Sequence, residues 1–180
     1  MKSSGEPPSP SKQQQLYDTV VAEFGIALDR LTVGYEADPG KRQDLRQEIH
    51  FQLWRSFALF DGRCSLKTWS FRVAHNTAVS YVNREHRKAS PLVGLEEIGH
   101  LPIQNQPGPT LDTQRSLDRL TSLIRQLKPL DRQIILCYLE EMDTAATAEI
   151  TGLSPANVSM KIHRIKATLA RHFNQERQHV

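Results

Sequence analysis

The sequence predicts an all-α protein: two small helical domains joined by a flexible linker, the C-terminal one a helix-turn-helix. Three observations lead to this prediction. Apolar residues recur at steps of three and four along most of the chain, as in amphipathic helices. Proline and glycine gather between residues 91 and 109 and exclude a long helix there. The alternating runs of β-branched residues that mark strands are missing from the sequence.

The first domain is expected to hold three helices within residues 16–90. Residues 1–15 are rich in Ser, Pro and Gln and are expected to form a disordered tail. Apolar steps place helices at about residues 16–32, 42–57 and 65–87, with a Pro-Gly break between the first two and a glycine loop before the third.

The second domain is expected over residues 112–174, after a linker at 91–111 and before a short tail at 175–180. Pro129 and Pro155 each suit the first turn of a helix, where the missing N–H has no intrahelical partner in any case. Four helices are predicted, at about residues 111–127, 129–139, 143–151 and 155–173.

Composition and motif content argue against several classes of protein. No apolar run approaches the ~20 residues of a membrane span, so membrane insertion is not expected and the protein is placed in the cytoplasm. Cys64 and Cys137 are too isolated for a disulfide framework or a zinc site. No P-loop, dinucleotide-binding glycine pattern or nucleophile elbow is present, so we expect no catalytic residue, cofactor or metal.

The charge is distributed in blocks. Residues 63–88 carry six basic side chains and one acidic one, and residues 150–180 carry five and one. The segments before and between these two basic blocks are net acidic. Two separate basic blocks on helices indicate a polyanion that is contacted at two places.

The last long helix has the pattern of a DNA-reading helix. Gly152 supplies a turn and Ser154 a suitable N-cap, and the apolar side chains that follow gather on one side of the helix. The opposite side carries small, amide and basic residues that suit a major groove, although the solvent face of a bundle helix would also be polar. The candidate residues are Asn157, Ser159, Met160, Lys161, His163 and Arg164.

The third helix of the first domain combines a core face with a second, polar-aromatic stripe. An indole beside amides and cations suits unstacked bases, because a ring can replace base stacking and an amide can read an exposed base edge. A Trp that is half-buried between helices would be the plainer interpretation of Trp69. The stripe contains Trp69, Arg72, Asn76, Ser80 and Asn83.

Two parts of the chain resemble the extracytoplasmic-function (ECF) sigma factors of the bacterial sigma-70 family. Residues 44–54, Phe60 and residues 69–78 look like the second domain of that family, whereas residues 127–133 and 152–164 look like its fourth domain. The likeness covers about residues 16–90 and 112–173, in the family's order and spacing.

The resemblance implies specific roles. The residues 44–54 would dock on the β′ clamp helices of core RNA polymerase through Asp44, Gln47, Glu48 and Leu53, and the second domain would melt and hold the −10 element with Phe60, Trp69, Arg72 and Asn76. The fourth domain would lie near the β flap and read the −35 element of promoter DNA in duplex form. An anti-sigma factor is an expected further partner.

The sequence departs from the family at several positions. Arg46 and His50 stand where the family has apolar residues, and Ser159 stands where a basic residue is common. The short helix before the turn lacks the usual acidic-aliphatic pair. Three alternatives stay open from the residues alone: a free-standing helix-turn-helix regulator, a helical interaction protein, and a hydrolase built from scattered His and Asp.

Overall fold

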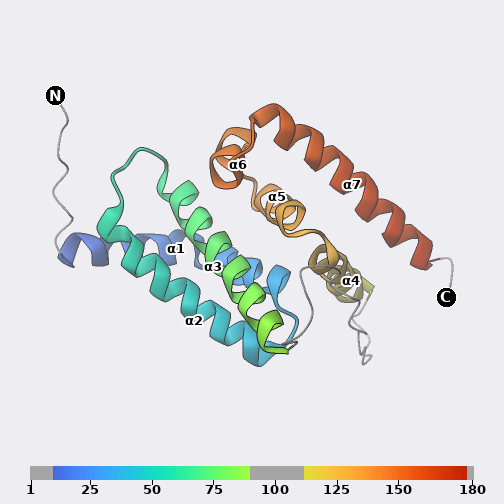
Figure 1. Ribbon diagram of the computed structural model, residues 1–180, viewed down its shortest axis with the longest axis horizontal. Coiled ribbons are helices and arrows are strands. Elements are labelled where there is room, and N and C mark those ends of the chain that lie inside the picture. The colour runs from blue at the N-terminus through green and yellow to red at the C-terminus, as the bar shows by residue number, and fades with distance from the viewer. Residues whose placement is uncertain (1–9, 90–111, 178–180) are drawn as a thin grey trace.

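The computed structural model describes residues 10–89 and 112–177, and in these two ranges every regular element is a helix (Figure 1). A 3-10 turn at Phe57–Leu59 follows the second helix. The α-helices are α1 (Pro10–Tyr35), α2 (Pro39–Ser56), α3 (Leu66–Ala89), α4 (Asp112–Gln126), α5 (Pro129–Leu139), α6 (Thr144–Thr151) and α7 (Pro155–Arg177). The all-α prediction is confirmed.

Helices α1, α2 and α3 pack on one another and form the first bundle. The backbone N–H of Lys41 donates to the Asp38 carboxylate, which caps α2, and Pro39 occupies the first turn. The four-residue steps Leu45, Ile49 and Leu53 point inward, as the apolar pattern predicts. They meet buried side chains from the other two helices, chiefly Val20, Leu28, Leu31, Phe71, Ala74 and Ala78.

Helices α4 to α7 form the second bundle, and local sequence explains its turns. Asp143 caps α6 by accepting a bond from the Ala146 N–H at 2.6 Å. Gly152 ends α6 with φ of +73°, a left-handed conformation that glycine adopts without strain. Ser154 then accepts a bond from the Asn157 N–H at the start of α7, as predicted. The result is a helix-turn-helix of α6 and α7.

The structure corrects one boundary at the N-terminus. Helix α1 begins at Pro10, so residues 10–15, expected in a disordered tail, are helical. The physical reason lies in α2: Gln13 donates from its side chain to the Trp54 carbonyl at 2.7 Å, and the Trp54 indole N–H donates to the Gln14 side chain. The expected linker at 91–111 lies outside the described residues.

The two bundles contact each other directly, along α1 and α3 on one side and α4, α5 and α6 on the other (Figure 1). Arg30 forms an ion pair with Glu140 at 2.5 Å, and Lys67 donates to the Glu140 carbonyl at 2.8 Å. Gly34 lies so close to Leu136 that an added Cβ would fall 2.7 Å from a Leu136 methyl carbon. A side chain at position 34 is therefore incompatible with this contact unless Leu136 moves.

A buried polar cluster lies at the centre of this interdomain contact. His75 is fully buried, with Nδ1 2.9 Å from the Tyr35 hydroxyl and Nε2 3.3 Å from the Cys137 Sγ. Burial lowers the pKa of His75 to about 3 and raises the pKa of Cys137 to about 12. The imidazole and the thiol are thus both neutral near pH 7.

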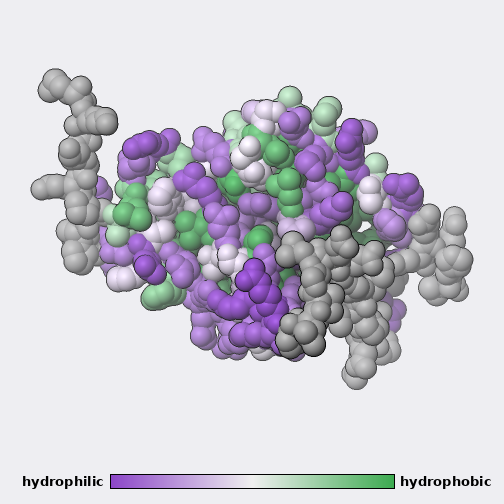
Figure 2. Space-filling model, viewed as in Figure 1, coloured by the Kyte–Doolittle hydropathy of each residue, from purple (hydrophilic) through white to green (hydrophobic). Residues whose placement is uncertain are grey.

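The face seen in Figure 2 is mostly hydrophilic, with apolar residues dispersed over it. No helix in residues 10–89 or 112–177 has the length and apolar character to cross a membrane. The same two ranges contain no cluster of three or more His, Cys, Asp or Glu residues that could hold a metal ion. Both cysteines carry free thiols.

Candidate nucleic-acid and partner interfaces

Trp69 lies near the start of α3, in a small cage of side chains. Ser65 caps this helix by accepting a bond from the Thr68 N–H at 3.0 Å. The Trp69 ring is partly exposed, meets the Phe60 ring edge-to-face at 5.3 Å, and has the Arg72 guanidinium 5.0 Å from its centroid. The ring, the cation and the second aromatic predicted from sequence are thus brought together.

The rest of the predicted stripe continues along the same helix toward its C-terminal end. Asn76, Ser80 and Asn83 are all exposed, at spacings that follow Trp69 and Arg72 around α3. The opposite side of α3, with Phe71 and Ala74, is fully buried in the bundle. The stripe is therefore an open surface that presents one ring, amides and a hydroxyl.

The exposed face of α2 differs in part from the predicted docking set. Asp44 and Gln47 are exposed, whereas Glu48 is paired with Arg84 of α3 at 2.6 Å. Leu53 is 0% exposed and belongs to the core, so its predicted contact with a partner is wrong. It continues the buried four-residue step that begins at Leu45 and Ile49.

Phe51 and Trp54, 58% and 41% exposed, supply the apolar surface that Leu53 was expected to give. The sequence held a signal for this, because Asp44, Gln47, Phe51 and Trp54 follow one another at steps of three and four. Together these four residues, here called the α2 outer face, form a mixed acidic and apolar surface.

Two polar residues of α2 that depart from the family pattern have partners on α1. Arg46 forms an ion pair with Asp29 at 2.8 Å, and His50 Nδ1 lies 3.0 Å from the Tyr17 hydroxyl. Burial, with a smaller contribution from Arg46, lowers the pKa of His50. Both residues thus join α1 to α2 and leave the α2 outer face to other side chains.

Helix α7 presents the polar face that the sequence predicts. Val158 and Ile165 are buried and hold the helix on α5 and α6. Lys161 is only partly exposed and forms an ion pair with Asp131 of α5 at 2.6 Å. The other candidates are exposed on one side of the helix: Asn157, Ser159, Met160, His163 and Arg164.

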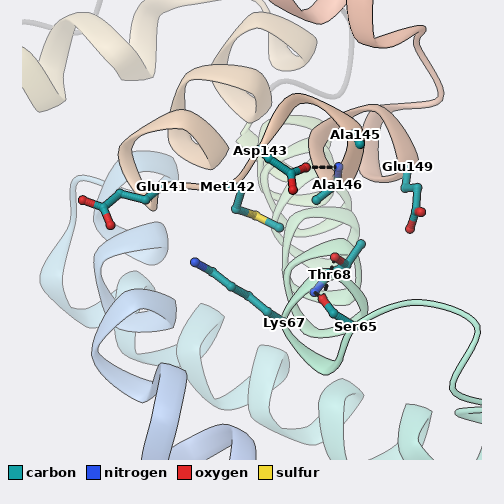
Figure 3. Close-up of a pocket in the computed structure, with 9 residues that line it drawn as sticks. All are labelled: Ser65, Lys67, Thr68, Glu141, Met142, Asp143, Ala145, Ala146 and Glu149. Atoms are coloured by element: carbon teal, nitrogen blue, oxygen red, sulfur yellow. Dashed lines mark hydrogen bonds between the residues drawn. The ribbon is translucent and has the colours of Figure 1, made fainter.

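A cleft lined by both polar and apolar side chains separates the start of α3 from the α5–α6 turn and α6 (Figure 3). Lys67 and Thr68 line it from α3 together with the capping residue Ser65, and the residues opposite come from the second bundle. The facing residues are Glu141, Met142, Asp143, Ala145, Ala146 and Glu149. On the α3 side, the cleft is lined by Thr68, the residue that precedes Trp69 in the sequence.

Each of the two bundles matches the model of a known protein family. Residues 20–88 match the model of sigma-70 region 2, and residues 117–169 match that of sigma-70 region 4. The first match contains α2, all of α3 except its last residue, and the whole Trp69 stripe. The second contains the helix-turn-helix.

Individual proteins that resemble this chain are also sigma factors, at a sequence identity below 25% for the two described here. The chain is 24% identical over 137 residues to the RNA polymerase sigma factor YlaC of Bacillus subtilis, a match that covers 76% of this chain and 79% of that protein. It is 22% identical over 169 residues to the ECF RNA polymerase sigma factor SigX of the same organism, covering 92% and 85%.

Solved structures of similar fold include the following two complexes. One is CnrH in complex with the cytosolic domain of CnrY, with a TM-score of 0.66 at 21% identity and 92% of both chains covered. The other is the sigma factor RpoE in complex with the anti-sigma factor NepR from Bartonella quintana, with a TM-score of 0.66 at 20% identity, covering 88% of this chain and 96% of that one.

Proposed function

This chain belongs to the extracytoplasmic-function group of the sigma-70 family and is a sigma factor for promoter-directed transcription initiation, and on that premise we propose how its surfaces divide the work. Helix α7 binds the −35 element as intact duplex. The α3 stripe captures bases of the −10 element after the strands separate. The protein acts by binding in the cytoplasm, and the polymerase performs the chemistry.

The observation that carries this proposal is the contrast between the two exposed surfaces. The α3 stripe offers a partly exposed indole followed by Asn76, and stacking on such a ring contributes ~1–3 kcal/mol per base. Helix α7 has no Phe, Tyr or Trp among its exposed candidates and offers Asn157, His163 and Arg164, which suit base edges and phosphates in a major groove. One surface fits separated bases and the other fits paired ones.

The α2 outer face is proposed as the surface that docks on core RNA polymerase. Phe51 and Trp54 provide the apolar contact area, and Asp44 and Gln47 provide polar contacts at its edge. Tryptophan in particular is enriched among the residues that dominate binding energy, and phenylalanine is enriched in interfaces generally. The family's β′ clamp helices are the proposed partner of this face, and the β flap that of the second bundle.

An anti-sigma factor is proposed as a regulatory partner. Among the structural neighbours with this fold, RpoE was solved with the anti-sigma factor NepR and CnrH with the cytosolic domain of CnrY. In this chain the cleft between α3 and the α5–α6 turn offers carboxylates from Glu141, Asp143 and Glu149. A basic segment of a partner would find complementary charge there.

The arrangement described cannot serve both promoter elements at once. Elements centred at −35 and −10 are about 85 Å apart at 3.4 Å per base pair. Helices α3 and α6 approach within 8 Å, and the chain from Ala146 to Ser159 spans about 30 Å, so the two reading surfaces lie within roughly half that distance. The two bundles must therefore separate when both elements are bound.

Run-off transcription tests the proposed function. Core RNA polymerase purified without sigma factors is combined with this protein and genomic fragments, and discrete transcripts are measured with and without the protein. We expect new start sites that depend on the protein, and co-purification with the core enzyme. Tight, specific DNA binding by the protein alone, with no effect on the core enzyme, would instead identify a free-standing regulator.

A further inference from the structure

Ser56, the last residue of α2, joins that helix to Trp69 by hydrogen bonds. Its hydroxyl donates to the Leu53 carbonyl at 2.8 Å and accepts from the Trp69 indole N–H at 3.0 Å. A serine hydroxyl has a single O–H to donate, and here it donates to the Leu53 carbonyl, which can only accept a hydrogen bond. The lone pairs of the Ser56 oxygen are then left for the indole, which can only donate.

The three contacts of the Trp69 ring have different consequences. Phe60 meets it at an interplanar angle of 68°, and Arg72 lies over its face. Both contacts hold the ring in place, but each tolerates a wide range of ring orientations. The bond to Ser56 is directional, because an N–H donor weakens steeply when its acceptor leaves the N–H axis. It therefore fixes the rotation of the indole within the cage.

We propose that Ser56 is a positioning residue for strand capture: it sets the plane of the Trp69 ring and ties that plane to the C-terminal end of α2. The proposal rests on the base-capturing role of Trp69 given above. Trp54 of the α2 outer face lies two residues before Ser56 in the chain. A polymerase that docks on this end of α2 would therefore contact the helix close to the serine that orients the Trp69 ring.

A single neutral hydrogen bond of this kind changes an equilibrium by about two- to tenfold. We expect Ser56→Ala to lower the open-to-closed ratio of promoter complexes by that factor. Affinity for the closed duplex stays unchanged, since Ser56 belongs to the first bundle and the proposed duplex-binding helix α7 to the second. Ser56→Thr is the matched control, because it keeps the hydroxyl.

The open-to-closed ratio is measured on holoenzyme by permanganate reactivity of unpaired thymines, with duplex affinity measured separately. Trp69→Phe keeps a ring but has no N–H donor, so Ser56→Ala adds no further loss in that background. This non-additivity supports the proposal. Equal losses from Ser56→Ala in the parent protein and in the Trp69→Phe background would show that the serine acts by another route and would overturn it.

A second readout needs neither polymerase nor promoter. The sequence has two tryptophans, so Trp54→Phe leaves Trp69 as the sole indole of the free protein. We expect Ser56→Ala to lower its fluorescence anisotropy and to increase quenching by acrylamide, and Ser56→Thr to change neither. Unchanged anisotropy with unchanged opening would remove the positioning role and leave the sigma activity intact. A loosened ring with undiminished opening would overturn both this proposal and strand capture by Trp69.

Discussion

Gly34 is the position at which one side chain should separate the two bundles. An added Cβ there would lie 2.7 and 2.9 Å from the two methyl carbons of Leu136, which is buried. Overpacking of a close contact costs about 1–3 kcal/mol, so Gly34→Leu should raise the population of separated bundles by about 5- to 150-fold. Leucine is also a better helix former than glycine, so α1 itself should not be weakened.

Cys137 reports on this separation, because it is fully buried beside His75 of the other bundle. In a Cys64→Ser background, alkylation of Cys137 should be faster in Gly34→Leu by a factor within that range, and small-angle scattering should show a larger radius of gyration. Gly25→Leu is the matched control, since a Cβ at Gly25 meets only a methyl of Val21 at 3.9 Å. Equal alkylation rates in the two variants, with unchanged helix content, would refute the reasoning.

Three further predictions follow from burial and capping. His75 is protonated near pH 6.5 in the unfolded chain but only near pH 3 in the folded one, so the unfolding free energy falls by about 1.4 kcal/mol per pH unit as the pH drops through this window. A His75→Gln variant lacks this titration. Chemical denaturation at pH 7 and pH 5 should therefore show it losing about 2 kcal/mol less stability than the parent. Asp143→Ala removes the α6 cap and should lower the unfolding free energy by about 1 kcal/mol, with Asp143→Asn close to the parent. Leu53→Ala should cost about 2–5 kcal/mol of stability, because Leu53 is fully buried. Phe51→Ala should leave the unfolding free energy nearly unchanged and weaken binding to core polymerase. If instead Leu53→Ala weakened binding and Phe51→Ala destabilised the fold, Leu53 would belong to the docking surface.

Most of the fold could be predicted because local signals agree with tertiary packing. The four-residue apolar steps of α2, the Asp143 and Ser154 caps and the left-handed Gly152 each act within a few residues of the chain. The start of α1 could not be predicted, because it depends on bonds from Gln13 and Gln14 to Trp54, about forty residues away. Sequence patterns carry no information on such pairs.

The candidate surfaces were predicted better than the residues' partners. Periodicity alone gives the exposed sides of α3 and α7, since each follows from the buried side of the same helix. The pairing of Lys161 with Asp131, the hydrogen bond from Trp69 to Ser56 and the neutral His75 at the interdomain contact all join different helices. For Leu53 the family resemblance and the four-residue apolar step point to opposite sides of α2, and the structure follows the apolar step.

The division of work between α3 and α7 is tested most directly by two variants on one promoter. Holoenzymes carrying Trp69→Ala or Arg164→Ala are compared for duplex binding and for permanganate reactivity of the −10 strand. We expect the first to keep most of its duplex affinity while losing strand opening, and the second to lose duplex affinity, with less effect on opening once bound. Parallel losses of both quantities in both variants would contradict the assignment of separated bases to one helix and paired bases to the other.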